Sequence, residues 1–195
     1  MLQLHSNTQP QWLDVVLANF TEFLLDHAAC ERKASASALS FVVHYPNHRE
    51  IVETMIQVAQ EELEHFARIT QIIHSKGLQH AADTKDSYVN QLLQLSRPKG
   101  DERLLDRLLL FSVIEGRGCE RFAMIAKSLP AHTEDERQLK ELYTDLVRSE
   151  SRHHMVGIQL AKNIFPEAVW KPRLQELLEK EASIVASLPH RPALH

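Results

Sequence analysis

One apolar helical stripe in this chain is interrupted in its middle by a carboxylate and an imidazole. Apolar residues recur there at steps of three and four, as on one buried face of a helix; they are Ile51, Met55, Val58, Ile69 and Ile72. The same stepping passes through Glu62 and His65. Burying such groups without partners costs several kcal/mol, and a metal ion would satisfy both, because carboxylates and neutral imidazoles bind iron, manganese and zinc. The chain must therefore fold so that other elements supply matching ligands.

Three further helical stripes carry a carboxylate where an apolar residue is expected. We expect helices over about residues 10–44, 48–75, 101–129 and 133–164. Glu31 lies 15 residues before Pro46, and Glu62 lies 16 residues after it, so the two carboxylates come level in an antiparallel pair. The interruptions in the last two helices are Glu115 and a second Glu-x-x-His motif, Glu150 with His153.

Glu120 competes with Glu115 for the ligand position on the third helix. The sequence Cys-Glu-Arg at 119–121 repeats the one at 30–32, which would match Glu120 with Glu31. Glu150 lies 17 residues after the start of its helix, whereas Glu120 lies only 9 residues before the end of the preceding one and Glu115 lies 14 before it. At about 1.5 Å per residue, Glu120 would be offset from Glu150 by roughly 12 Å. We therefore expect Glu115 to be the ligand and Glu120 to lie behind the ligands or on the surface.

The order of these elements predicts an all-α, ferritin-like four-helix bundle. Its two helical hairpins would be joined by a long crossover at residues 78–100, which contains a short amphipathic piece. We expect the core helices within about residues 10–165, a peripheral C-terminal helix at about 171–187, and a single domain over residues 1–195. The content of 44% hydrophobic residues and only 5 glycines suits one helical domain with a sizeable core.

The predicted ligands are the inventory of a dinuclear carboxylate site: one Glu from each of two helices and a Glu-x-x-His motif from each of the other two. They are Glu31, Glu62, His65, Glu115, Glu150 and His153. Four carboxylates neutralise two divalent ions, and two ferrous ions can each give an electron to dioxygen. We favour iron over manganese or zinc. Gly116 and Gly118, unusual inside a helix, indicate either close helix packing or a local bulge beside a substrate cavity.

Charge and cysteine content predict a soluble, cytoplasmic protein that does not bind membranes. No apolar run approaches the length of a membrane span, and the first residues lack the pattern of a signal peptide. Cys30 and Cys119 do not form a CxxC motif and are expected to be inert, reduced thiols. The net charge of -4 means that any nucleic-acid contact would need a local basic patch.

Four segments of the chain resemble the tRNA 2-methylthio-isopentenyladenosine hydroxylases, a ferritin-like non-haem di-iron family. They are LDHAACERKA at 25–34, EELEHF at 61–66, IEGRGCERF at 114–122 and SESRHH at 149–154. The resemblance implies a monooxygenase that uses dioxygen and two electrons from an external electron-transfer protein or reductase. Its substrate would be the isopentenyl side chain of a modified adenosine beside the anticodon in the tRNA loop. The six ligands predicted above would bind two iron ions.

Several other residues have two interpretations. His27, one turn before Glu31, would either support the ligands from behind or be a core histidine, and His154 is expected to be exposed. The candidate phosphate contacts, which could equally be solvated or paired with acids, are Arg97, Lys99, Arg103 and Arg107, with Lys171 and Arg173 elsewhere. Alternative functions are another di-iron oxygenase, of the quinone hydroxylase kind, and a ferroxidase or iron-binding protein.

Overall fold

The computed structural model describes residues 2–195, in which there are seven helices and no strand. The helices are α1 (Pro10–Ala18), α2 (Phe20–His44), α3 (Arg49–Ser75), α4 (Ser87–Leu93), α5 (Gly100–Ser128), α6 (Glu134–Ile164) and α7 (Glu167–Ser187). The chain packs as two compact units. The α2–α3 unit contains residues 14–85 and 191–194, and the α5–α6 unit contains residues 2–13, 86–190 and 195. The single domain expected from the sequence stays a prediction.

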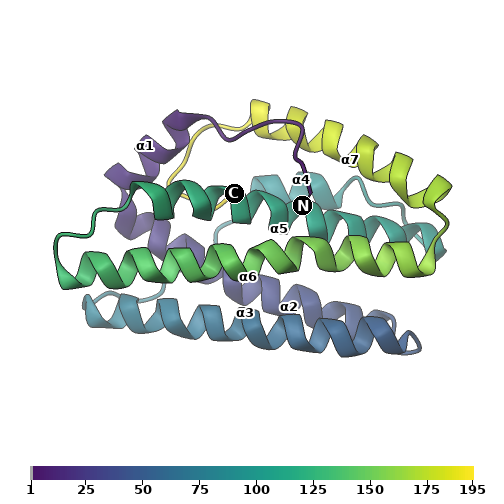
Figure 1. Cartoon of the computed structure of the whole chain (residues 1–195), viewed down its shortest axis with the longest axis horizontal. Helices are drawn as coiled ribbons and strands as arrows, with labels where there is room; N and C mark the ends of the chain where they lie inside the picture. The colour runs from purple at the N-terminus through teal and green to yellow at the C-terminus, as the bar shows by residue number, and fades with distance from the viewer. Residues whose placement is uncertain (1) are drawn as a thin grey trace. The chain divides into compact units, whose positions relative to one another are not determined.

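The α2–α3 unit is an antiparallel helical hairpin (Figure 1). Its turn falls at Pro46, as predicted, and α3 ends before Gly77, whose φ of +70° suits a glycine at a helix C-terminus. Between the helices, Ser35 Oγ donates to the Ala59 carbonyl oxygen at 2.8 Å. Apolar side chains on both helices are buried, including Phe41 of α2 and Met55 of α3. Each helix of the hairpin therefore carries one buried stripe.

The predicted continuous helix over residues 10–44 is wrong at Asn19, where α1 ends and α2 begins. Asn19 has a φ of −130°, outside the helical range, and its amide side chain donates to the Val15 carbonyl oxygen. Asparagine competes with the helix in this way because its side chain can bond to nearby backbone groups. The apolar periodicity continues across Asn19, and it therefore conceals the break.

The α5–α6 unit contains a second antiparallel hairpin, with α4 and α7 packed against it (Figure 1). A capping box begins α6, where the Thr133 side chain accepts from the Glu136 N–H and the Glu136 side chain accepts from the Thr133 N–H. At Gly157 the two long helices come so close that a Cβ would lie 2.0 Å from the Leu108 carbonyl oxygen. Glycine is therefore needed at this crossing.

A buried carboxylate ties α4, α5 and α7 together. Asp106 of α5 accepts hydrogen bonds from Arg97, after α4, and from Arg173 of α7, at 2.8–3.0 Å. The helix containing Arg173 begins at Glu167, four residues before the predicted start, although Pro172 lies inside it. Among residues 2–195, every helix is too short or too polar to cross a lipid bilayer.

Candidate metal centre

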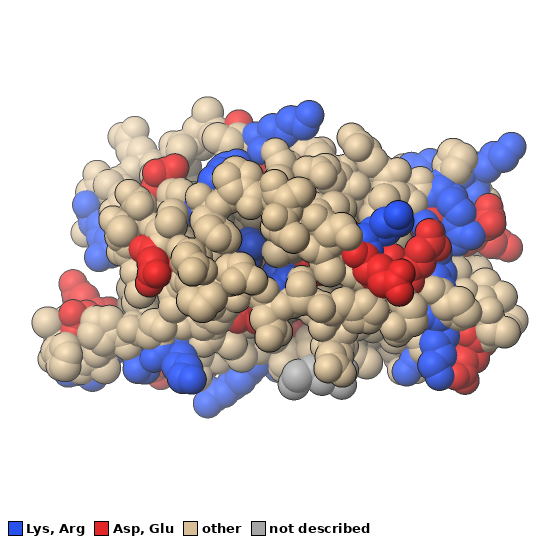
Figure 2. All heavy atoms as spheres, turned by 90° about the horizontal axis from the view of Figure 1, so that it is seen from above, with Lys and Arg blue, Asp and Glu red and all other residues tan. Residues whose placement is uncertain are grey.

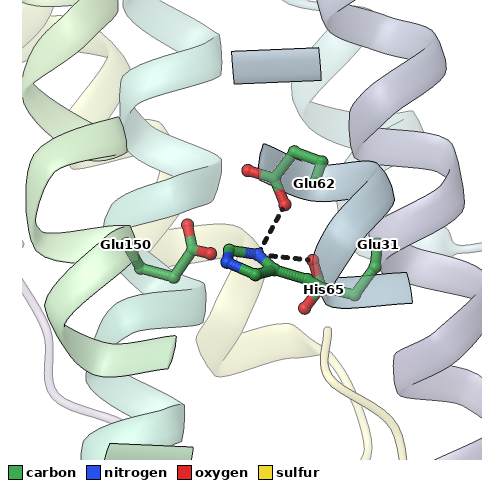
Figure 3. A group of neighbouring side chains, drawn as sticks. All are labelled: Glu31, Glu62, His65 and Glu150. Carbon is green, nitrogen blue, oxygen red and sulfur yellow. Dashed lines mark hydrogen bonds and ion pairs between the residues drawn. The ribbon is translucent and has the colours of Figure 1, made fainter. Parts of the chain in front are cut away.

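Glu31 of α2 and Glu62 and His65 of α3 converge inside the α2–α3 unit (Figure 3). All three are buried, and one potential ligand atom of each lies within 4.8 Å of those of the other two. His65 Nδ1 lies 3.2 Å from Glu62 Oε2 and 3.6 Å from Glu31 Oε2. The carboxylates come level because they are almost equally far from the turn at Pro46. Their roles as metal ligands stay a prediction, and the geometry supports it.

The electrostatics of this cluster favour a cation. Burial alone would lower the pKa of His65, but the hydrogen bonds and negative charges of Glu31 and Glu62 outweigh it and raise that pKa to about 10. Two carboxylates in a buried site therefore stabilise positive charge at the point where they meet. A divalent metal ion would meet the same need, and the donor set of two carboxylates and an imidazole suits iron, manganese or zinc.

His27 supports Glu31 from behind. Its side chain is fully buried, and Nε2 donates to Glu31 Oε1 at 2.6 Å, one helical turn away. The ring also stacks on Phe23, with centroids 5.8 Å apart. Since the contact holds the carboxylate in one orientation, it supports the prediction that His27 orients a ligand.

The α5–α6 unit carries the second set of predicted ligands. Glu150 and His153 lie on one turn of α6, both are buried, and His153 Nδ1 is 3.3 Å from Glu150 Oε2. Glu115 lies on α5 and is partly buried. Burial, followed by the charges of Glu150 and Glu115, raises the pKa of the Cys119 thiol to about 11, so this thiol stays protonated. The two carboxylates therefore act on the same small region of the unit.

Glu120 is engaged elsewhere. Its carboxylate accepts the Thr8 N–H at 2.9 Å and the Thr8 hydroxyl at 2.7 Å, and it pairs closely with Arg117. These contacts use both oxygens of Glu120, which favours Glu115 as the ligand from α5. The role of Glu120 behind the ligands stays a prediction.

The predicted bulge at Gly116 and Gly118 is absent, since α5 is an unbroken α-helix over Gly100–Ser128. A Cβ on Gly116 would lie 3.1 Å from Leu2 Cδ2. Gly116 therefore accommodates the side chain of Leu2, whereas a Cβ on Gly118 would meet its nearest atom only at 4.0 Å. Close packing, the other interpretation of the sequence, thus applies to Gly116 alone, and neither glycine supports a substrate cavity at this place.

The four candidate phosphate contacts differ in their exposure and in their partners. Arg97 is bound to Asp106 and also pairs with Glu102 at 2.8 Å. Lys99 and Arg103 are exposed, whereas Arg107 is half-buried. On the face drawn in Figure 2, basic side chains lie singly or in small groups beside acidic ones. A tRNA contact through these four residues stays a prediction.

The expectation that His154 is exposed is wrong, because only 3% of the residue is accessible. Its Nδ1 donates to the Glu150 carbonyl oxygen at 3.0 Å, and its Nε2 accepts the Leu2 N–H at 3.3 Å. Burial lowers the pKa of this imidazole, in keeping with a neutral ring. The sequence interpretation missed the segment that covers His154. The only signal in the sequence is the pair of apolar residues Leu2 and Leu4 among polar ones, which is too short to define a pattern.

Comparisons of the sequence with known proteins all identify the same family of tRNA hydroxylases. A family model described as tRNA-(MS[2]IO[6]A)-hydroxylase (MiaE) matches residues 2–195. A protein of Pseudomonas putida described as tRNA 2-(methylsulfanyl)-N(6)-isopentenyladenosine(37) hydroxylase is 33% identical over 161 residues, which cover 83% of this chain and 76% of that protein. A Salmonella typhimurium protein of the same description is 29% identical over 162 residues, covering 83% of this chain and 57% of its own length.

The fold comparison agrees with the helical architecture. A solved structure described as Protein 43 with aldehyde deformylating oxygenase activity from Synechococcus has a TM-score of 0.92 and 31% sequence identity. The match covers 100% of this chain and 96% of the other. The all-α, ferritin-like fold class predicted from the sequence is confirmed.

Proposed function

Because the chain belongs to the tRNA-(MS[2]IO[6]A)-hydroxylase family, we propose that it hydroxylates the isopentenyl group of 2-methylthio-isopentenyladenosine next to the anticodon of tRNA. The observation that carries this proposal is the buried convergence of Glu31, Glu62 and His65. Two buried carboxylates and an imidazole that meet at one point are a donor set that suits a metal ion such as iron. Since the substrate is tRNA, the enzyme would work in the cytoplasm.

We further propose that two iron ions are held by the six residues expected from the sequence. They are Glu31, Glu62, His65, Glu115, Glu150 and His153. The four carboxylates balance the charge of two ferrous ions, and each Glu-x-x-His turn offers a carboxylate and an imidazole from one helix face. When bound, the iron pair would supply electrons to dioxygen and so make the oxidant that an allylic C–H bond requires.

The protein's own side chains would prepare this centre. His27 holds the Glu31 carboxylate by a 2.6 Å hydrogen bond. Burial of the ligands excludes bulk water, which would otherwise screen their charges. The protonated thiol of Cys119 is a poor ligand and does not compete with the carboxylates.

The overall reaction balances when one oxygen atom enters the substrate C–H bond and the other leaves as water. Besides dioxygen it consumes two electrons and two protons, and we assign the electrons to an external electron-transfer protein. The target adenosine lies in a single-stranded loop, so that its base can be splayed out without breaking a duplex.

Mass spectrometry of tRNA nucleosides tests the substrate. Cells that lack this gene should accumulate the unhydroxylated nucleoside, and a plasmid copy should restore the hydroxylated one, whereas an E62Q copy should not. If the hydroxylated nucleoside persists without the gene, the proposed substrate is wrong. Iron analysis of the purified protein should give two ions per chain. Two ions with rapid iron oxidation and no change in tRNA would instead favour a ferroxidase.

A second candidate follows from the 0.92 TM-score to a protein described as having aldehyde deformylating oxygenase activity. The same purified enzyme should be incubated with an aldehyde, dioxygen and a reducing system. Release of formate in that assay, with no change in the tRNA nucleosides, would favour aldehyde deformylation over hydroxylation.

A further inference from the structure

Residues 2–9 form an irregular segment, bent at His5 and Ser6, that we call the N-terminal strap; it runs from the start of α1 to the N mark in Figure 1. The segment alternates like a strand, with every second residue turned inward. Leu2, Leu4 and Ser6 are partly buried and Thr8 is buried, whereas the intervening residues are exposed. Such alternation shows that one side of the strap packs against the α5–α6 unit along its length.

One end of the strap is fastened to α5 by Arg117, whose side chain is fully buried. The guanidinium donates to the Ser6 carbonyl oxygen at 2.9 Å and to Thr8 Oγ1 at 3.1 Å. Two further N–H groups donate to the carboxylate of Glu181 on α7 at 2.8 and 3.0 Å, and another pairs with Glu120. The strap cannot leave this position without depriving a buried cation of hydrogen bonds, which costs several kcal/mol.

The other end of the strap reaches α6 at His154. The Leu2 N–H donates to His154 Nε2 at 3.3 Å, and His154 Nδ1 donates to the Glu150 carbonyl oxygen at 3.0 Å. The Leu2 side chain lies over Gly116 of α5, where a Cβ would be 3.1 Å from Leu2 Cδ2. The imidazole is therefore held between the strap and the backbone of a proposed metal ligand.

We propose that His154, locked in place by the strap, is a positioning residue for Glu150 and His153. The inference rests on the proposed metal site. The carbonyl of Glu150 lies on the helical turn that carries both ligands, so a second hydrogen bond to it orders that turn. His154 thereby acts on the metal site through the backbone of α6, without touching the metal.

The test uses the full-length protein and cobalt(II), whose visible absorption reports its ligand geometry. The H154A variant should bind cobalt(II) about 10-fold more weakly, at the lower end of the range for residues that support ligands, and with an altered spectrum. The H154Q variant should bind close to wild type, because its amide can donate to the carbonyl and accept the Leu2 N–H. The H154L variant fills similar space but makes neither hydrogen bond, so it should be impaired like H154A; near-wild-type binding by H154L would show that His154 only fills space.

A matched pair of variants tests the strap itself. L2D places a charge on the inward side, and Q3D places the same charge on the exposed side. Only L2D should weaken cobalt(II) binding and increase amide hydrogen exchange in residues 150–158. The proposal is wrong if H154A and L2D match wild type in both measurements, or if H154Q is as impaired as H154A.

The same experiment separates this inference from the proposed function. If wild type does not bind cobalt(II), the metal site itself is wrong. Amide exchange in the metal-free protein then still tests whether His154 and the strap order residues 150–158. Faster exchange in H154A and L2D, but not in Q3D, is the expected result there; equal exchange in all of them would overturn the role of the strap.

Discussion

Gly157 allows α6 to cross α5 in contact with its backbone, and G157A should be strongly destabilising. The added Cβ would lie 2.0 Å from the Leu108 carbonyl oxygen and 2.7 Å from Ser112 Oγ, whereas favourable contacts lie at about 3.5 Å. Because the obstacle is backbone, the helices must move apart. That movement would also break the hydrogen bond from the Ile158 N–H to Ser112 Oγ, now 3.0 Å long.

The magnitude follows from three contributions. Overpacking costs about 1–3 kcal/mol, and a clash with backbone belongs at the upper end. The lost hydrogen bond adds about 1 kcal/mol, and the better helix propensity of alanine returns about 1 kcal/mol. We expect the free energy of unfolding to fall by about 3 kcal/mol, which for a chain of this size lowers the melting temperature by about 6–12 °C.

The control is G118A on α5. A Cβ at Gly118 would meet its nearest atom, His195 Cε1, at 4.0 Å, an ordinary contact. This variant should match wild type or gain up to about 1 kcal/mol. Chemical and thermal denaturation of both variants provides the measurement. A G157A protein that melts at or above the wild-type temperature would refute the inferred close approach of the helices.

Three further predictions concern ionisable side chains. Burial alone would raise the pKa of Asp106, but the hydrogen bonds from its two arginine partners lower it. The stability that ionised Asp106 gives the folded protein is therefore complete above the usual aspartate pKa of about 4. It is lost as the pH falls through the lowered pKa of the folded state. Relative to D106N, wild type should be more stable by about 2 kcal/mol at pH 7, less than the roughly 3–5 kcal/mol of a fully buried pair. Urea denaturation between pH 7 and pH 2 should show this difference shrinking, and a constant difference would contradict it. H27A should weaken cobalt(II) binding about 10- to 100-fold by removing the contact with Glu31, and an unchanged titration curve would show that this contact is dispensable. E115Q should lower the number of iron ions bound per chain while E120Q keeps it at two; metal analysis giving the reverse would make Glu120 the ligand.

The sequence predicts the site best where a position on an apolar helical stripe carries an ionisable residue. Glu62 and His65 stand out because the apolar residues around them set a clear helical period, and the structure brings them together with Glu31. A capping box such as that at Thr133 is equally local, since both partners lie within one turn. Features of this kind can be predicted because their physical cause lies within a few residues of chain.

Other features depend on residues far apart in the chain. His154 is off the apolar stripe of α6 and is buried by a segment 152 residues earlier, which no periodicity on α6 could indicate. The break at Asn19 is a local exception: its side chain bonds to the Val15 carbonyl oxygen instead of solvent, and the apolar period that continues across it conceals the break. Gly116 is ambiguous in sequence because its neighbour in space, Leu2, determines whether the glycine permits packing or a bulge.

Each unit contains one histidine outside the proposed ligand set that is bonded to a proposed ligand, but the two act on different groups. His27 bonds to the carboxylate of Glu31, so that it affects the charge and direction of the ligand oxygen itself. His154 bonds to the backbone carbonyl of Glu150, so that it affects only where that helical turn lies. Loss of His27 should therefore change metal affinity with little effect on the exchange of backbone amides, whereas loss of His154 should change both. That difference distinguishes tuning of a ligand from positioning of the helix that carries it.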